Sequence, residues 1–509
     1  MTTLHPVARL ADLHEERGTA VEIDDTEILL LRVGDEVRAF QANCPHAGAP
    51  LKDGAVCQGR LVCPWHKASF AVADGSLCEP PALDALQRYP VEIREGEVLV
   101  GSEPLRPQST EAARDERLFT IVGAGAAGTA AAAALREFGF GGRILLIGRE
   151  AGEPYDRTAL SKFVLQGDKT PEEAPPLREA DFFRQQRIER LHAEVVRLDA
   201  QARQLELGNG QTLAYDGCVL APGGEPKPLV VPGAELKGVH LLRTRADAAA
   251  LLADLPAKSR AVIVGAGFIG LEAASALRKQ GLAVDVVAPA SLPFVKQMGE
   301  TLGQHFKTLH EANGVTFQAP NEVVAIEGDD RVRQVRLQDG TRLPADLVLV
   351  GTGITPATDF LAHLSLADDG SVPVDAQLKA AEALYAVGDL ATFPFAGQPT
   401  RIEHWRLAQQ HGRLAARNLL GYAERYADVP FFWTLHHGKR YEYLGQPRQW
   451  DDMHLEGSLG DQTFVALLLA QEQVVGVVAC QRERATAVLA QRLRQPLDRA
   501  EALDIIRAN

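Results

Sequence analysis

Two short stretches near the start of the chain combine side chains that bind iron or zinc. Cys44-Pro-His46 and Cys63-Pro-Trp-His66 each offer one thiolate and one imidazole, with 16 residues between His46 and Cys63. Zinc accepts the same four ligands, so ligand type alone does not choose the metal. Zinc fingers favour two cysteines on one loop and two histidines on another. One of each per loop instead suits a [2Fe–2S] cluster in which one iron takes both cysteines and the other takes both histidines, and we predict such a cluster.

Two glycine-rich turns further along the chain predict dinucleotide sites. Each follows an apolar strand pattern and precedes a helical one, and each has the spacing G-x-G-x-x-G. Free backbone N–H groups and the dipole at such a helix start favour a diphosphate. The glycines are Gly123, Gly125, Gly128, Gly265, Gly267 and Gly270.

The residue at the end of the strand that follows each turn indicates how the ribose of the dinucleotide would be bound. Glu150 stands 22 residues after Gly128, which suits hydrogen bonds to a ribose diol. The corresponding position after Gly270 is Ala288, 18 residues on, so the second site lacks an acid there. The preference between NADH and NADPH is therefore left open.

These residues need strands and helices to position them. The first hundred residues predict short strands between turns, including 27–33, 36–41 and one strand over 91–100. The glycine turns predict helices at 129–138 and 271–280, each between two strands. A stretch rich in Pro, Ser and charge at 102–116 predicts a linker.

Several stretches resemble known families. The two Cys/His loops resemble the Rieske [2Fe–2S] family. Residues 117–509 resemble the FAD-dependent NAD(P)H:ferredoxin reductases of bacterial oxygenase systems. The whole chain resembles the Rieske-bearing branch of the apoptosis-inducing-factor-like flavoproteins, within the pyridine nucleotide-disulfide oxidoreductase superfamily. The stretches that carry the second resemblance are Glu153-Pro-Tyr-Asp-Arg157-Thr-Ala-Leu-Ser-Lys162, Leu220-Ala-Pro-Gly-Gly224, Gly351-Thr-Gly-Ile-Thr-Pro356, Tyr385-Ala-Val-Gly-Asp389 and Glu403-His-Trp405.

The resemblance implies a role for each matching residue. For FAD it implies the first glycine turn, with further contacts from Glu150, Arg157, Lys162, Gly388, Asp389, Glu403 and Trp405. For the nicotinamide nucleotide it implies the second glycine turn together with Glu272 and Gly353. Lys162, Glu272 and Trp405 are the candidate catalytic residues, because they would lie against the reacting rings.

The expected fold is multidomain. An N-terminal all-β Rieske domain is expected at 1–105, and an α+β C-terminal reductase or interface domain at 426–509. Between them we expect two α/β Rossmann-like domains, one binding FAD at 117–243 and 345–425 and one binding NAD(P) at 244–344.

Composition and charge narrow the choice of partners. Of the 509 residues, 46% are hydrophobic and 24% charged, and the net charge is −14, which repels phosphate backbones and anionic lipid. Nucleic acid and membrane are therefore not expected partners. The start of the chain lacks a leader pattern and no apolar run could span a membrane, so we expect a cytoplasmic protein, with a homodimer left open.

The expected activity is an FAD-dependent NAD(P)H:acceptor oxidoreductase. Electrons would pass from NAD(P)H through FAD to the [2Fe–2S] cluster and on to an external acceptor such as an oxygenase or another redox protein. No C-x-x-C pair occurs among the six cysteines, which excludes a dithiol reductase. The alternative is an NADH-responsive redox-sensing or apoptosis-inducing-factor-like regulatory flavoprotein with little turnover. A nitrite-reductase-like electron supplier is less favoured, because no sirohaem domain is visible.

Overall fold

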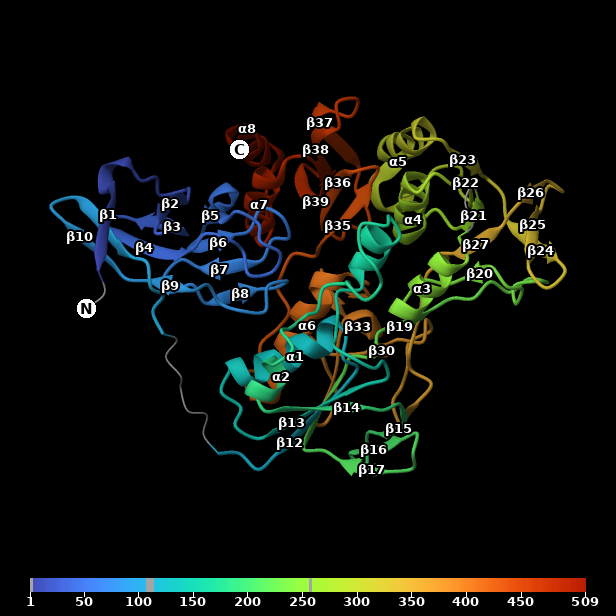
Figure 1. Ribbon diagram of the computed structural model, residues 1–509, viewed down its shortest axis with the longest axis horizontal. Coiled ribbons are helices and arrows are strands. Elements are labelled where there is room, and N and C mark those ends of the chain that lie inside the picture. Colours follow the sequence, from blue (N-terminus) through green and yellow to red (C-terminus); the bar gives the residue numbers. More distant parts are fainter. Residues whose placement is uncertain (1–2, 107–113, 256–258) are drawn as a thin grey trace. The chain divides into compact units, whose positions relative to one another are not determined.

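The computed structural model describes residues 3–106, 114–255 and 259–509 (Figure 1). Its internal contacts divide the chain into two units. Unit 1 contains Met1–Ala113, Ala427–Trp433 and Glu442–Asn509, and unit 2 contains Arg114–Tyr426 and Thr434–Tyr441. Part of the predicted linker, residues 107–113, lies outside the described residues.

The N-terminal part of unit 1 consists of strands and two short 3-10 helices, which confirms the all-β prediction. Its three sheets have the strand orders β1-β11-β10, β2-β3-β4-β9 and β5-β6-β7-β8. The elements are β1 (Leu4–Arg9), η1 (Leu10–Asp12), β2 (Thr19–Ile23), β3 (Thr26–Val33), β4 (Glu36–Gln41), η2 (Leu51–Asp53), β5 (Ala55–Cys57), β6 (Arg60–Val62), β7 (Ser69–Ala71), β8 (Leu77–Glu79), β9 (Arg88–Tyr89), β10 (Val91–Arg94) and β11 (Glu97–Gly101).

The prediction of one strand over 91–100 is wrong. The segment is a hairpin in which β10 pairs antiparallel with β11. Glu95 and Gly96 both have positive φ, 50° and 79°, as the two central residues of a type I′ turn require. Apolar residues continue on both sides of this turn, so the sequence pattern alone reads as a single long strand.

The C-terminal domain combines one antiparallel sheet with two helices, as the α+β prediction requires. The strand order is β35-β36-β39-β38-β37, and α7 and α8 pack on the apolar residues of β38 and β39. Residues 434–441, at the turn between the first two strands, belong to unit 2. The elements are β35 (Phe431–His436), β36 (Lys439–Gly445), β37 (Asp452–Ser458), β38 (Thr463–Ala470), β39 (Gln473–Cys480), α7 (Glu483–Arg492) and α8 (Arg499–Ala508).

Within unit 1 the N-terminal β domain packs directly on the C-terminal domain. Ala55 and Val62 contact Ala487 of α7 in a small apolar cluster. Beside the cluster, Lys67 Nζ lies 3.0 Å from Glu442 Oε1, and the two residues are 0% and 3% exposed. The Lys67 ammonium also donates to the backbone carbonyl of Pro64 at 2.5 Å and to that of Glu483 at 3.2 Å.

A second buried charge strengthens the same interface. Glu79 is 3% exposed and accepts a hydrogen bond from Arg60 at 2.5 Å. It also pairs with Arg494, which bonds Asp428 at 2.6 Å. Buried charges are tolerated only when partners surround them, so these residues fix how the two segments of unit 1 meet.

Unit 2 contains two parallel sheets of the Rossmann type, which confirms the predicted α/β class. The first has the order β14-β13-β12-β18-β32-β31, with β31 as the antiparallel edge, and the second has the order β20-β27-β21-β22-β23. Their strands are β12 (Leu118–Val122), β13 (Arg143–Gly148), β14 (Ile188–His192), β18 (Gly217–Leu220), β20 (Val239–His240), β21 (Arg260–Val264), β22 (Ala283–Val287), β23 (Val315–Gln318), β27 (Leu347–Val350), β31 (Lys379–Ala381) and β32 (Leu384–Ala386).

Smaller sheets and helices complete unit 2. The remaining strands are β15 (Val195–Asp199), β16 (Gln204–Leu207), β17 (Thr212–Ala214), β19 (Gly224–Pro226), β24 (Val323–Gly328), β25 (Val332–Leu337), β26 (Arg342–Pro344), β28 (Ile354–Pro356), β29 (Leu361–Ala362), β30 (Val372–Pro373), β33 (Ala391–Phe395) and β34 (Gln398–Thr400). The helices are α1 (Ala126–Glu137), the π-helix η3 (Leu160–Val164), α2 (Phe182–Gln185), α3 (Arg245–Ala253), α4 (Phe268–Lys279), α5 (Val295–Ala312), the 3-10 helix η4 (Gly388–Leu390) and α6 (Trp405–Leu419).

Each glycine turn opens its helix three residues earlier than the sequence pattern indicates. Helix α1 begins at Ala126 and α4 at Phe268, so Gly128 and Gly270 lie in the first helical turn. The predicted starts at 129 and 271 assign all three glycines to the turn, whereas the last glycine of each motif already lies in the helix. No helix in the described part of the chain is long and apolar enough to cross a membrane.

We expect Lys67→Met to lower the free energy of unfolding by about 3–5 kcal/mol, because it leaves the Glu442 carboxylate buried without its cation. The double variant Lys67→Met/Glu442→Met should recover most of this loss. Thermal and denaturant unfolding measure both. The matched control is Lys52→Met, which breaks an exposed pair with Glu27 (3.6 Å, side chains 47% and 42% exposed) and should cost less than about 1 kcal/mol. Equal losses for the two single variants would contradict the importance of the buried pair.

Candidate functional site

The two Cys/His loops have the same backbone hydrogen bonds. The N–H of Cys44 donates to the carbonyl of Ala49, and the N–H of Cys63 donates to the carbonyl of Ala68, both at 2.8 Å. One loop follows β4 and the other follows β6. Two loops of one shape therefore present equivalent side chains, one cysteine and one histidine each.

The four predicted metal ligands come together as two pairs. His46 Nδ1 and His66 Nδ1 lie 3.0 Å apart, with the rings nearly perpendicular at 87°. Cys44 and Cys63 are buried, 2% and 0% exposed. The hydrogen bond from Cys44 is the largest of the causes that lower the pKa of the Cys63 thiol to about 7.

This pairing fits a two-iron cluster. Each iron of a [2Fe–2S] cluster of the Rieske type takes two protein ligands, both thiolates on one iron and both imidazoles on the other. A single metal ion would instead need three or more side chains around one point, and the described residues contain no such group of His, Cys, Asp or Glu. The converging Nδ1 atoms and the paired thiols supply the donor set that a cluster needs.

An indole from the C-terminal domain covers one of the imidazoles. The ring of Trp433 in β35 packs on His66 with centroids 5.2 Å apart and planes tilted by 40°. Both residues belong to unit 1. Nothing in the sequence signals this contact, because residues 66 and 433 are far apart and Trp433 matches no motif.

The first glycine turn has the geometry of a diphosphate cradle. Gly123 has a φ of 104°, and a side chain there would collide with the carbonyl of Ala221. A side chain on Gly128 would collide with the carbonyl of Gly123. A Cβ on Gly125, in contrast, would meet no protein atom within 4 Å. The outer glycines thus serve backbone packing, whereas the middle one leaves room for a ligand at the start of α1.

The segment after β13 joins several predicted residues. The Glu150 carboxylate accepts a hydrogen bond from the Tyr155 hydroxyl at 2.8 Å and pairs with the Arg157 guanidinium. Arg157 also donates to the carbonyl of Arg243 at 2.9 Å. Burial, the largest cause, raises the pKa of Tyr155 to about 12, so its hydroxyl stays a donor at neutral pH.

Three further predicted residues lie around the end of β32. Asp389 follows Gly388, whose φ is 69°, and its carboxylate lies 3.4 Å from Arg243. Arg401 joins the backbone carbonyl of Asp389, at 3.3 Å, to the Glu403 carboxylate, at 2.5 Å.

Trp405 is the first residue of α6. Its indole Nε1 is a buried atom without a hydrogen-bond partner within the described structure. A buried N–H of this kind normally has an acceptor, and an aromatic cofactor with ring carbonyls would supply one.

Lys162 and Glu272 form a buried ion pair. They are 5% and 3% exposed, and Lys162 Nζ lies 3.1 Å from Glu272 Oε1. Three more donors surround the carboxylate: the Ser161 hydroxyl at 2.6 Å, the Thr434 hydroxyl at 2.6 Å and the N–H of Leu435 at 3.1 Å. Lys162 is therefore not a solvated charge.

The sequence did not point to all of these donors. Ser161 stands beside Lys162 in the motif and could have been found there. Thr434 and Leu435 belong to no motif.

The second glycine turn repeats the geometry of the first. Gly265 has a φ of 110°, and side chains on Gly265 or Gly270 would collide with nearby backbone. Gly267 and Gly353 have no protein atom within 4 Å of a built Cβ. Ala288 directly follows β22 and is 3% exposed, so the end of this strand offers no acid for a ribose.

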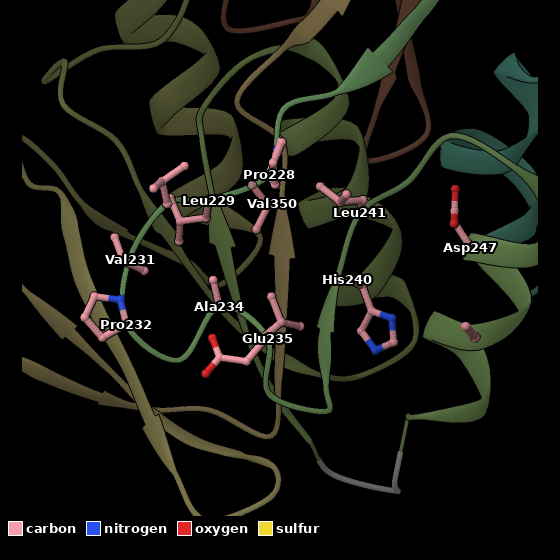
Figure 2. Close-up of a pocket in the computed structure, with 13 residues that line it drawn as sticks. Pro228, Leu229, Val231, Pro232, Ala234, Glu235, His240, Leu241, Asp247 and Val350 are labelled. Atoms are coloured by element: carbon pink, nitrogen blue, oxygen red, sulfur yellow. The ribbon is translucent and has the colours of Figure 1, made fainter. Parts of the chain in front are cut away.

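A pocket of about 750 Å³ lies elsewhere in unit 2, along the segment 228–241 and α3 (Figure 2). Leu229, Leu241 and Val350 make it largely apolar. The His240 ring at its edge bonds the carboxylate of Asp254 at 2.9 Å. None of the predicted cofactor residues lines this pocket.

Comparison with known proteins agrees with this geometry. The family model described as pyridine nucleotide-disulphide oxidoreductase matches residues 119–412, and the model of the Rieske [2Fe–2S] domain matches residues 3–90. The human protein named apoptosis-inducing factor 3 is 34% identical over 497 residues, covering 93% of this chain and 81% of that protein.

Bacterial reductases resemble the part after the Rieske domain. Rhodocoxin reductase of Rhodococcus erythropolis is 35% identical over 371 residues, which cover 72% of this chain and 87% of the reductase. The crystal structure of the covalent putidaredoxin reductase–putidaredoxin complex matches with a TM-score of 0.72 and 29% identity, over 77% of this chain and 98% of that chain. The chain belongs to the pyridine nucleotide-disulphide oxidoreductase family, and its residues 3–90 form a Rieske [2Fe–2S] domain.

Proposed function

We propose that this protein is an FAD-dependent NAD(P)H:acceptor oxidoreductase that passes electrons through its own Rieske cluster to an external acceptor. The observation that supports the proposal is that one chain combines two glycine turns at helix starts with two loops that bring His46 and His66 together beside two buried cysteines. Similarity to the ferredoxin–NAD(+) reductase component of the p-cumate 2,3-dioxygenase system of Pseudomonas putida, 35% identical over 371 residues, supports electron transfer between a nicotinamide nucleotide and a ferredoxin.

The first cradle is assigned to FAD. Gly123, Gly125 and Gly128 would hold the diphosphate at the start of α1, and Glu150 would hold the ribose. Asp389 would bind the ribityl chain or the diphosphate, next to Gly388 and Glu403. The unpartnered indole N–H of Trp405 would donate to the ring system. Arg157 is held between Glu150 and Arg243 and supplies positive charge beside the diphosphate.

The second cradle is assigned to the nicotinamide nucleotide. Gly265, Gly267 and Gly270 would hold its diphosphate. Gly353, where a built Cβ has no protein atom within 4 Å, would leave room for the nucleotide. Glu272, two residues after this turn, connects the cradle to Lys162. When bound, FAD takes an electron pair from NAD(P)H and passes electrons on singly, which is what a [2Fe–2S] cluster accepts. Lys162 and Glu272 contribute a fixed pair of opposite charges in a site with little water.

Cys44, Cys63, His46 and His66 are assigned as the cluster ligands. The Trp433 ring packs on His66 and would hold that imidazole in place. Because donor and acceptor are joined in one chain, the local concentration of the cluster near its donor is set by the linker, at about the mM level for a short flexible one. The final acceptor would be an oxygenase component or another redox protein. This protein would be located in the cytoplasm.

A regulatory flavoprotein is the second candidate, favoured by the similarity to apoptosis-inducing factor 3 along 93% of this chain. Such a protein would turn over slowly with every acceptor and would change its self-association when NADH reduces it. An enzyme would instead turn over repeatedly with at least one acceptor.

Anaerobic reduction tests the proposed function directly. NADH or NADPH should bleach the flavin absorbance first and then produce the electron paramagnetic resonance signal of a reduced Rieske cluster. The rates with the two nucleotides give the donor preference that Ala288 leaves open. Complete flavin reduction without any cluster signal would contradict the internal electron transfer.

Matched glycine variants test which cradle holds which nucleotide. Gly125→Ala should fold, because its Cβ meets no protein atom within 4 Å, and should weaken FAD binding by about tenfold, or about 1.4 kcal/mol. Gly267→Ala has the same surroundings and should keep FAD but raise the Kd for NAD(P)H by a similar factor. Loss of FAD from the Gly267 variant alone would reverse the assignment. Flavin content and nucleotide titration are the measurements.

Lys162→Met tests the buried cation. We expect FAD to remain bound, while its reduction by NADH slows by about 10²-fold, the usual cost of removing one preorganised donor from a reaction site. Stopped-flow absorbance measures the rate. The control is Lys279→Met on α4, which removes an exposed pair with Asp168 (2.7 Å, lysine side chain 52% exposed) and should leave the rate unchanged. Similar rates in both variants would remove Lys162 from the reaction.

A further inference from the structure

A continuous series of hydrogen bonds leads away from Glu272. The Thr434 hydroxyl contacts Glu272 Oε1 at 2.6 Å and His436 Nε2 at 3.0 Å. His436 Nδ1 lies 3.2 Å from His310 Nε2, and His310 Nδ1 lies 3.1 Å from His437 Nε2. All five residues belong to unit 2, and both ring nitrogens of His436 and His310 take part.

The carboxylate fixes the direction of every hydrogen bond in the series. An ionised carboxylate only accepts, so the Thr434 hydroxyl must donate to Glu272 and accept from His436 Nε2–H. His436 Nδ1 then accepts from His310 Nε2–H, and His310 Nδ1 accepts from His437 Nε2–H. Each imidazole is thus a neutral Nε2–H tautomer with one donor and one acceptor, which is the arrangement along which a proton can hop.

The surroundings keep these imidazoles neutral. Burial is the largest cause that lowers the pKa of His436 to about 3 and that of His437 to about 4, and it lowers the pKa of His310 well below its usual value. Lys162, His305 and His437 act in the same direction on His436, as does Arg278 on His437. The backbone of Leu271 acts in the opposite direction on the pKa of His436.

The series begins in the protein interior and ends near its surface. Glu272, Thr434, His436 and His310 are buried, 3%, 2%, 0% and 0% exposed, whereas His437 is partly exposed. The N–H of His437 donates to the Ser275 hydroxyl at 2.6 Å, which holds the outer end against α4. Exposed Gly438 follows at the turn.

We propose that Glu272, Thr434, His436, His310 and His437 form a proton relay between the flavin site and solvent. The proposal rests on the assignment of Lys162 and Glu272 to that site. Oxidation of one NAD(P)H to NAD(P)⁺ yields two electrons and one proton. The hydride adds one negative charge to the flavin site, and Glu272 balances this charge by taking up one proton from solvent through the relay. When the two electrons leave to one-electron acceptors, the hydride's own proton is released from the flavin and Glu272 returns its proton to solvent through the relay.

The relay works through two orientations. In the orientation that the ionised carboxylate imposes, a proton taken up at His437 Nδ1 shifts each following proton by one position and leaves Glu272 protonated. The three imidazoles are then Nδ1–H tautomers, so every donor points outward. A proton held on the Glu272 carboxyl returns along the reversed series to His437 and solvent, which restores the first orientation.

Nitrogen-15 NMR of histidine-labelled protein tests the relay without turnover. In oxidised, FAD-loaded protein we expect His436, His310 and His437 to be neutral Nε2–H tautomers at neutral pH. In His310→Phe, His436 and His437 lose a hydrogen-bond partner, so each should populate both neutral tautomers. His305→Phe is the matched control, because His305 bonds the Tyr441 hydroxyl at 2.9 Å outside the series, and it should leave them unchanged. Fixed Nδ1–H tautomers in the oxidised protein would overturn the proposal.

Proton release supplies the second test. Protein reduced by NADH is mixed with ferricyanide, and a pH-indicator dye and the flavin absorbance are followed together. Reoxidation releases two protons, one from the hydride and one from Glu272. In His310→Phe we expect flavin reduction by NADH to be unchanged and release of the Glu272 proton to slow by about 10²-fold, as for loss of a positioned acid–base group. The His305→Phe control should release protons at the normal rate. Normal release from His310→Phe would overturn the relay.

His437→Gly is a second variant that tests the relay if His310→Phe does not fold. His437 has a φ of 48°, a conformation that glycine adopts more easily than histidine. Proton release should slow in this variant and recover when imidazole is added to the buffer, which a purely structural role would not produce. Slowing without rescue would contradict the relay. If NADH does not reduce the flavin of the wild-type protein, the proposed function is contradicted. The histidine tautomers measured by NMR then still test the hydrogen-bond series.

Discussion

The buried carboxylate of Glu272 is the constraint on which much of unit 2 depends. A buried charge is stable only when cations and hydrogen-bond donors surround it, and losing one partner costs several kcal/mol. Glu272 collects donors from Ser161 and Lys162 of η3 and from Thr434 and Leu435 of β35. One carboxylate therefore holds the helix after the second glycine turn, the segment around Lys162 and the hairpin 434–441 in one arrangement.

Unit 1 uses the same principle for its own site. Lys67 directly follows the proposed ligand His66 and its ammonium is buried against Glu442, so the loop that carries His66 is held by the C-terminal domain. The Trp433 ring also packs on the His66 ring. The N-terminal Rieske domain thus depends on a segment more than 350 residues away in the chain, as the separation of 375 residues between Lys67 and Glu442 shows. The C-terminal domain is part of the metal site's scaffold.

The sequence predicted the features that local pattern determines. The paired Cys/His loops and the glycine turns depend on a few residues at fixed spacing. The structure brings His46 and His66 together and opens a helix at each glycine turn. The break at Glu95 and Gly96 was missed because apolar residues stand on both sides of it within ten residues, although Glu-Gly is itself a turn signal. Trp433, Thr434 and the histidine series could not be predicted, since their partners come from distant segments and single Trp, Thr or His residues carry no spacing signal. Lys67 was overlooked although it adjoins a predicted ligand, because its partner Glu442 lies in another domain.

Redox-induced infrared difference spectroscopy tests the central claim, that Glu272 is the group that exchanges a proton with the relay. Cycling the FAD-loaded protein between its oxidised and reduced forms should produce a band of a protonated carboxyl group that is absent from Glu272→Gln. Its decay should be slowed in His310→Phe. A spectrum without any carboxyl band, or one that persists unchanged in Glu272→Gln, would contradict the account.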